Sequence, residues 1–99
     1  MNEAPKRPRF LLLNPKDNVA VAVSPLKSGE QIEIDSQHVT LANDIPAGHK
    51  FALREIGAGS DVIKYGEVIG KATSSIHSGE HAHVQNIVSA RLPGPARTL

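Results

Sequence analysis

The sequence predicts a compact all-β domain with many short strands joined by tight glycine turns. Hydrophobic residues make up 39% of the 99 residues, and most of them are Val, Ile, Leu and Ala, which suit pleated sheets. Most apolar runs are short and are bounded by Gly, Pro, Asn, Asp or Ser, as strands are. No window keeps apolar residues at helical spacing beyond one or two turns, so only "ALREI" (52–56) is a candidate for a single helical turn.

The strands are expected in eight segments of the chain. In order, these are residues 9–14, 18–23, 31–35, 38–43, 51–53, 61–64, 68–73 and 81–88. The first is a run of leucines, and the second alternates valine and alanine after the turn-forming pair Asp17–Asn18. The third, "QIEID", alternates polar and apolar residues as a half-buried strand does. The last five are short segments that contain apolar residues and lie between turn-forming residues.

A short module with a central glycine recurs four times and leads the chain into a strand each time. Each copy has an apolar residue, two further residues and a glycine, and then a strand begins. The copies start at Leu26, Ile45, Ile56 and Ile76, and their glycines are Gly29, Gly48, Gly59 and Gly79. Glycine tolerates positive φ, so each copy predicts a tight turn, and "KYGEVIGKA" predicts another. The glycines are 19, 11 and 20 residues apart, and this uneven spacing excludes a solenoid.

The length limits the chain to one small domain with one core. The first nine residues contain Pro5 and Pro8 and are expected to be a disordered lead-in, and residues 10–88 are expected to form the domain. Residues 89–99 contain two prolines, which cannot join a strand ladder, and are expected to be a tail or a linker.

Composition argues against several classes of function. The formal net charge is +1 and the aromatic residues are Phe10, Phe51 and Tyr65, so we expect no nucleic-acid partner. The absence of cysteine removes disulfides, thiolate catalysis and thiolate metal sites, and it fits a reducing cytoplasm. The apolar runs are too short for a signal peptide or a membrane span, so a cytoplasmic protein without a membrane partner is expected.

The stretch "IHSGEHAHVQN" (76–86) is the first candidate site. On a strand, His81, His83 and Gln85 share one face, while Ala82 and Val84 can point into the core. Two imidazoles that project in parallel can bind a metal, but they need a further ligand. That ligand would come from His49, Glu67 or a partner domain. The alternative is a polar face that contacts solvent or docks on a partner.

Two other groups of residues are candidates for chemistry. His49 and Lys50 follow a turn glycine, where His49 could act as a base or ligand and Lys50 could pair with a substrate carboxylate. Alternatively, His49 caps the turn and Lys50 is solvated. Lys64, Tyr65 and Glu67 surround a turn glycine and could serve as acid, base, anion binder or ligand. Alternatively, Tyr65 packs at the edge of the core while Lys64 and Glu67 form a weak surface pair.

Three ordered motifs, "DIPAGHKFALREI", "VIKYGEVIG" and "GEHAHVQN", are similar to a known family. They resemble the small N-terminal SAF-type domain of the altronate and galactarate dehydratases, which is a separate small subunit in the sulfolactate sulfo-lyases. The resemblance covers about residues 10–88. It implies a β-clip fold and a much larger catalytic domain or subunit as partner. It also implies β-elimination of water from a hexonate or hexarate, helped by a divalent metal (iron, manganese or magnesium) that is shared with or held by the partner.

The resemblance implies roles for particular residues. The expected catalytic residues are His49, Lys50, Lys64 and Tyr65; the expected substrate-binding residues are Lys50, Glu67 and Asn86; the expected metal ligands are His81 and His83. Family members often carry a third histidine where this chain has Gln85, a much poorer ligand. A non-catalytic module that recognises a partner protein or a sugar acid is the alternative function. The sugar acid (altronate, galactarate or sulfolactate), the metal and any homo-oligomer stay open, as does the choice between a free-standing subunit and an N-terminal domain.

Overall fold

The computed structural model describes residues 9–34 and 36–89, and over these ranges the protein is all-β, as the sequence predicts. Most of the expected lead-in (1–9) and tail (89–99) lies outside these ranges. No helix long and apolar enough to cross a bilayer occurs in the described part of the chain. The strands are β1 (Phe10–Leu11), β2 (Val19–Ala22), β3 (Gln31–Ile34), β4 (Gln37–Thr40), β5 (Lys50–Ala52), β6 (Asp61–Lys64), β7 (Glu67–Ala72), β8 (His81–Ala82) and β9 (Ile87–Ser89).

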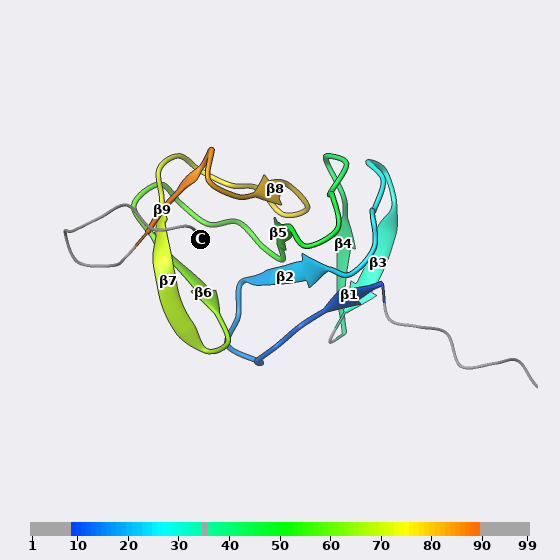
Figure 1. Ribbon diagram of the computed structural model, residues 1–99, viewed down its shortest axis with the longest axis horizontal. Coiled ribbons are helices and arrows are strands. Elements are labelled where there is room, and N and C mark those ends of the chain that lie inside the picture. The colour runs from blue at the N-terminus through cyan, green and yellow to red at the C-terminus, as the bar shows by residue number, and fades with distance from the viewer. Residues whose placement is uncertain (1–8, 35, 90–99) are drawn as a thin grey trace, which may run out of the picture.

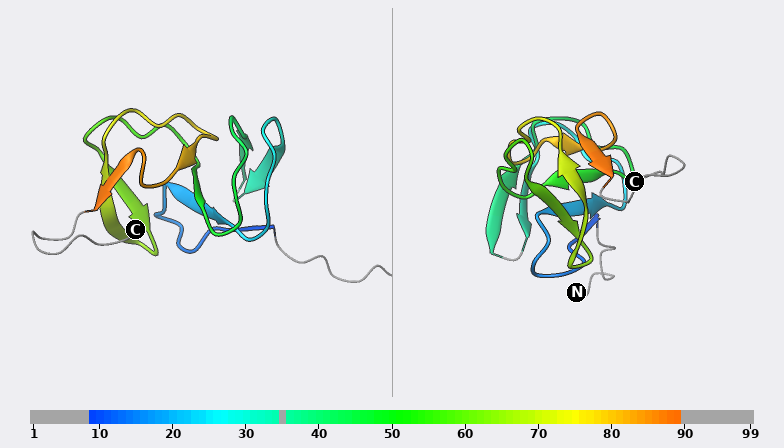
Figure 2. Two further views of the ribbon diagram at one scale, coloured as in Figure 1. Left: turned by 45° about the horizontal axis from the view of Figure 1, so that its top comes forward. Right: turned by 90° about the vertical axis from the view of Figure 1, so that its left-hand side faces the viewer.

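The strands form three small antiparallel sheets. A central sheet has the order β1-β2-β5-β8. The β3–β4 hairpin lies at one end of the molecule and the β6-β7-β9 sheet lies at the other, as two of the views show (Figures 1 and 2). The central sheet therefore joins the two outer ones, and it carries β5 and β8, which bear most of the candidate residues.

The glycine modules pair two by two and reveal an internal repeat. Leu26 and Ile45 exchange two backbone hydrogen bonds of 2.9 and 2.8 Å, and Ile56 and Ile76 exchange two of 2.8 Å. The β3–β4 hairpin lies between the first two modules, and the β6–β7 hairpin lies between the second two. The uneven glycine spacing follows from this arrangement, because the long gaps contain hairpins and the short gap contains β5.

The four module glycines adopt the conformation that the sequence predicts. Their φ angles lie between +83° and +90°. In each module the residue after the glycine donates its N–H to the carbonyl three positions earlier, as His49 does to Pro46 at 3.0 Å. A glycine with positive φ at the third position of such a turn defines a type II turn. The turn after Gly48 thereby sets the position of His49 at the start of β5.

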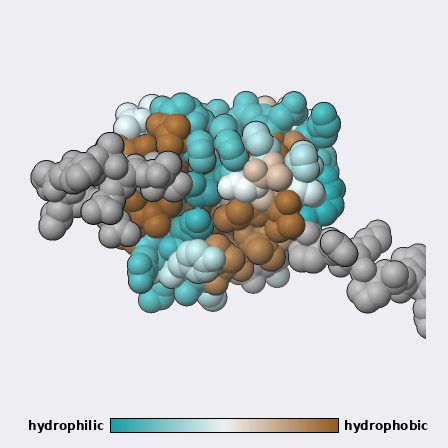
Figure 3. Space-filling view, in the orientation of Figure 1, coloured by the Kyte–Doolittle hydropathy of each residue, from teal (hydrophilic) through white to brown (hydrophobic). Residues whose placement is uncertain are grey.

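The buried side chains form two clusters, whereas the sequence predicted one core. One cluster surrounds Phe51 in the half that contains β3 and β4, and the other surrounds Val62 in the half that contains β6 and β7. β5 serves both, because Phe51 belongs to the first cluster and Ala52 to the second. The internal repeat explains the division, since each half buries its own pair of modules. Figure 3 shows hydrophobic side chains at the surface over β1 and β2, and a hydrophilic upper edge.

Two local predictions were wrong. Residues 81–88 do not form one strand, because the chain turns after β8 and Asn86 donates its N–H to the carbonyl of His83 at 3.0 Å. Val84 lies in this turn and is 58% exposed instead of buried. The segment 52–56 forms no helical turn, because Ile56 is held by its backbone pairing with Ile76.

A turn precedes β2 as predicted, but its central residues are Pro15 and Lys16, and Asp17 closes it by donating its N–H to the Asn14 carbonyl at 3.0 Å. Asp17 and Asn18 have a role that the sequence did not reveal. Asp17 is 1% exposed, and its carboxylate accepts the backbone N–H groups of Tyr65 (3.1 Å) and Gly66 (2.8 Å). The Asn18 side chain accepts the N–H of Ile63 at 2.8 Å. Tyr65 and Gly66 both have positive φ, as a two-residue hairpin loop of type I′ requires. Asp17 and Asn18 therefore fix the β6–β7 hairpin against β2.

Candidate metal and carboxylate site

β5 and β8 bring three histidines together. His49 immediately precedes β5, and His81 begins β8. The strands pair Phe51 with His81 and Lys50 with Ala82, so that His83, just after β8, lies beside His49. One side-chain nitrogen from each of the three histidines lies within 4.8 Å of the others. His49 Nδ1 and His81 Nε2 lie 2.8 Å apart and form a hydrogen bond, so one of the two rings donates to the other.

The three rings form a nearly parallel stack. The centroids of His49 and His83 are 4.1 Å apart with 18° between the planes, and those of His49 and His81 are 5.0 Å apart with 16°. Because the rings are nearly parallel, their nitrogens lie close together but their lone pairs point in similar directions. Three imidazole nitrogens this close are a donor set that transition metals accept in proteins, and the rings would have to turn for all three to bind one ion.

The electrostatics of the cluster favour uncharged rings at His81 and His83. Burial, and next the charge of His49, lowers the pKa values of His81 and His83 below the usual range for histidine. Rings with lowered pKa values are neutral at pH 7 and keep a lone pair for a cation. His83 Nδ1 is also buried without a hydrogen-bond partner in the described part of the chain. Such orphaned polar atoms are rare, so the cluster fits a cation by charge state and by donor chemistry.

Lys50 follows His49 on β5, pairs with Ala82 between His81 and His83, and is almost completely buried. It is 3% exposed, and burial, with the charge of Lys64 as a smaller cause, lowers the pKa of its ammonium group. Among the described residues, no carboxylate forms an ion pair with Lys50. A buried ammonium group without a partner is costly, and an anion that bound beside it would offset that cost. β5 and β8 therefore carry three clustered imidazoles and a buried ammonium group.

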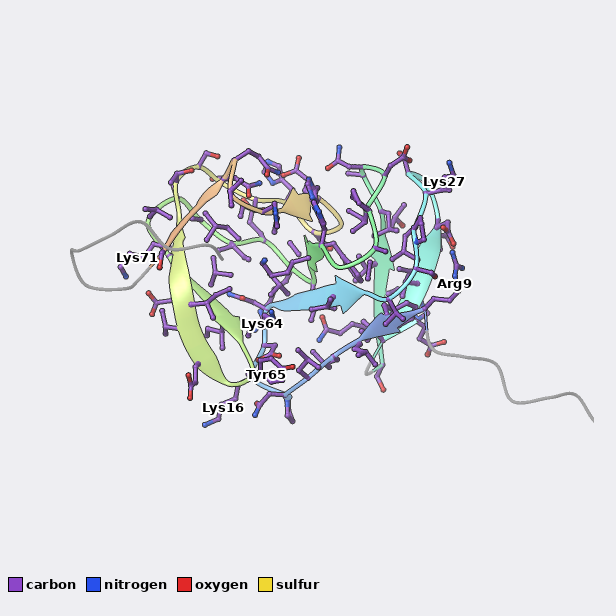
Figure 4. The ribbon with its side chains drawn as sticks, viewed as in Figure 1. Arg9, Lys16, Lys27, Lys64, Tyr65 and Lys71 are labelled. Atoms are coloured by element: carbon purple, nitrogen blue, oxygen red, sulfur yellow. The ribbon has the colours of Figure 1, made fainter. Side chains whose placement is uncertain are left out.

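The β6–β7 hairpin contributes Lys64 but keeps Tyr65 apart. Lys64 Nζ lies 5.5 Å from the centroid of the Tyr65 ring, a cation–π contact, and Figure 4 shows both residues near the start of β2. Tyr65 is 65% exposed, so it does not pack at the core edge. Glu67 is exposed, and the described residues show no ion pair between it and Lys64. The structure thus groups Lys64 with Lys50 and leaves Tyr65 and Glu67 outside the histidine cluster.

Three amide side chains hold the strand that carries His81 and His83. Asn86 accepts the N–H of His83 and donates to the carbonyl of His81, both at 2.9 Å. Gln85 Nε2 lies 3.1 Å from His81 Nδ1, and Asn43 Oδ1 accepts the His81 N–H at 3.0 Å. Gln85, seen in the sequence only as a poor ligand, therefore orients the His81 ring. Sequence reasoning missed Asn43 because nothing local links it to a residue 38 positions away.

Comparison with known proteins places the chain in a family. Residues 8–90 match the family described as the altronate/galactarate dehydratase SAF domain. Altronate dehydratase from Escherichia coli (strain K12) is 45% identical over 78 residues, which are 79% of this chain and 16% of that protein. Galactarate dehydratase (L-threo-forming) from the same organism is 36% identical over 92 residues, 91% of this chain and 17% of that protein.

A smaller relative has a length closer to that of this chain. The (2R)-sulfolactate sulfo-lyase subunit alpha of Paracoccus pantotrophus is 45% identical over 53 residues, which are 54% of this chain and 79% of that subunit. Against the two dehydratases, by contrast, the chain spans about one sixth of the relative's length. The matched region contains all three histidines and Lys50. The chain belongs to the SAF-domain family of the altronate and galactarate dehydratases.

Proposed function

We propose that this chain is the SAF part of a sugar-acid dehydratase and acts with a larger catalytic domain or subunit. In the assembled enzyme, His49, His81 and His83 bind a divalent metal, and Lys50 binds the carboxylate of a hexonate or hexarate. The observation that carries the proposal is the convergence of three imidazoles within 4.8 Å beside a buried, unpaired lysine. The relatives support it, because two of them are named as dehydratases of sugar acids and a third as one subunit of a lyase.

The donor set distinguishes among the three metals that the sequence resemblance implies. Imidazole nitrogens suit iron(II), whereas magnesium and manganese prefer oxygen ligands. Iron is therefore the metal we propose. A bound divalent metal would act as a Lewis acid on the substrate's oxygens. Elimination also needs a base for the proton α to the carboxylate, and the larger partner is the proposed source of the remaining groups.

Within this chain, the proposed work is binding and orientation. Lys50 holds the carboxylate, and the nearby positive charge of Lys64 adds to the attraction of an anion. Gln85, Asn43 and Asn86 keep His81 and His83 in place through the contacts described above. Tyr65 and Glu67 lie outside the cluster, so an acid–base role for them would require the partner to meet the β6–β7 hairpin.

Metal binding by the 99-residue chain tests this proposal. Anaerobic calorimetry with iron(II) should show one site per chain, and His83→Ala should weaken binding by at least the roughly 10–100-fold that lost supporting contacts cost metal sites. The matched control is His38→Ala, because His38 lies exposed on β4 and away from the cluster. Equal iron binding by wild type and His83→Ala would refute the metal assignment.

One observation favours the alternative of a docking module without catalysis. Val68 on β7 and Val88 on β9 are 47% and 55% exposed on neighbouring strands, and exposed aliphatic side chains often mark protein interfaces. Co-purification of the tagged chain from its own host, followed by mass spectrometry, tests whether a large dehydratase-like chain binds it. If His49→Ala and Lys64→Ala then weaken assembly but leave turnover unchanged, the docking function is correct.

A further inference from the structure

A polar groove of about 500 Å³ lies beside the histidine cluster. His81 belongs to both, so a ligand in the groove would extend to the cluster. The other side chains that line the groove can all form hydrogen bonds; they are Asn43, Ser74, Ser75, Glu80, Gln85 and Asn86. The volume is within the range of about 300–1,000 Å³ that is usual for small-molecule sites.

The internal repeat explains why the groove forms at this place. Residues 42–44 and 73–75 are equivalent bends, each of which leads into a module isoleucine. Both bends are fixed to the segment around β8: Ala42 donates its N–H to the carbonyl of Gly79, and Thr73 donates to the carbonyl of Asn86, each at 2.9 Å. Both halves of the molecule therefore contribute to the lining, Asn43 from one and Ser74 and Ser75 from the other, together with His81 of β8.

The groove keeps unused hydrogen-bonding groups of both kinds. Asn43 uses its carbonyl oxygen for the His81 N–H, which leaves its amide NH₂ group, and Glu80 uses one oxygen for the His77 N–H at 2.8 Å, which leaves the other. The hydroxyls of Ser74 and Ser75 have no hydrogen-bond partner in the described part of the chain. A lining that offers both donors and acceptors matches neighbouring hydroxyl groups, which need both.

The charge of the lining decides which part of a ligand fits. No lysine or arginine of the described residues lines the groove, whereas Lys50 pairs with Ala82, the neighbour of His81 on β8. A carboxylate would therefore bind at the Lys50 side and not in the groove. We propose that the groove binds the hydroxylated carbon chain of the sugar acid while its carboxylate lies at Lys50. This orientation rests on the proposed function, because it takes the histidine cluster as the reaction centre.

The test compares two acids on two forms of the intact chain by ¹⁵N NMR titration. Altronate carries a hydroxylated chain, and glycolate has a carboxylate and one hydroxyl group. We expect altronate to shift the amide signals of Ser74 and Ser75, and glycolate to shift only signals near Lys50 and the histidines. The double variant Ser74→Ala/Ser75→Ala should weaken altronate binding about tenfold and leave glycolate binding unchanged.

The result can distinguish a wrong groove assignment from a wrong proposed function. Ser60→Ala removes an exposed hydroxyl from another module and should leave both affinities unchanged. Altronate shifts confined to the cluster, with an unchanged affinity in the double variant, would overturn the groove assignment and leave the proposed function intact. If neither acid shifts any signal, sugar-acid binding by this chain is refuted, and the groove assignment fails with it.

Discussion

Replacement of Asp17 by alanine should destabilise the domain strongly, because this buried carboxylate holds the β6–β7 hairpin in place. Asp17→Ala removes two hydrogen bonds, to the N–H groups of Tyr65 and Gly66, and leaves both donors without their acceptor. A hydrogen bond to a charged group contributes about 1.5–3 kcal/mol, so the lower value for each gives a loss of about 3 kcal/mol in the free energy of unfolding. That is a large share of the about 5–15 kcal/mol that stabilises an ordinary domain.

Urea denaturation followed by circular dichroism measures this loss. With a slope of about 1 kcal/mol per molar urea for a small domain, the midpoint should fall by about 3 M. Asp44→Ala is the matched control, because Asp44 is exposed and accepts one backbone N–H, that of Ser28 at 2.9 Å. Its cost should stay below about 1 kcal/mol. Equal effects of the two substitutions would refute the role given to Asp17.

Three further predictions concern the turns, the cluster and the buried lysine. Gly79→Ala should cost more stability than Gly48→Ala in thermal unfolding. Both glycines have positive φ, but a Cβ at Gly79 would collide with the Thr40 carbonyl, whereas a Cβ at Gly48 meets nothing. Equal costs would exclude that collision. His81 and His83 bind protons less readily in the folded chain than in the unfolded chain. The free energy of unfolding should therefore fall as the pH drops through about 6.5. Urea midpoints that do not change between about pH 7.5 and 5.5 would contradict this. Lys50→Met should weaken altronate binding at least about tenfold in calorimetry. Stability should not fall, because the substitution removes a buried charge that has no described partner. Unchanged affinity would argue against Lys50 as the carboxylate site.

The strands and turns could be predicted because their signals are local. The alternation of "QIEID" and the position of Gly48 within its module each depend on a few neighbouring residues, and the structure confirms the strand and the turn. The prediction of one strand over residues 81–88 was wrong because Asn86 caps the backbone of His83, which ends β8 early. Such side-chain contacts compete with strand pairing and leave no periodic pattern in the sequence.

The candidate site could be predicted only in part. The sequence singled out His81 and His83 as a pair and His49 as one source of a third ligand, and the pairing of β5 with β8 brings the three together. The sequence could not show that Lys50 is buried, because burial depends on strands that are distant in the chain. The same limit applies to Asn43, which contacts His81 across 38 positions, and to Asp17, which contacts the hairpin across 48 positions.

We propose that this SAF domain takes part in dehydration and does not only dock. The deciding measurement is the rate of altronate and galactarate dehydration by the complex that co-purifies with the tagged chain, with wild-type chain or His83→Ala. We expect turnover of the preferred acid to fall at least about 100-fold while the stoichiometry of the complex stays the same, since one metal ligand is lost. Unchanged turnover in a complex that contains the His83→Ala chain would contradict it.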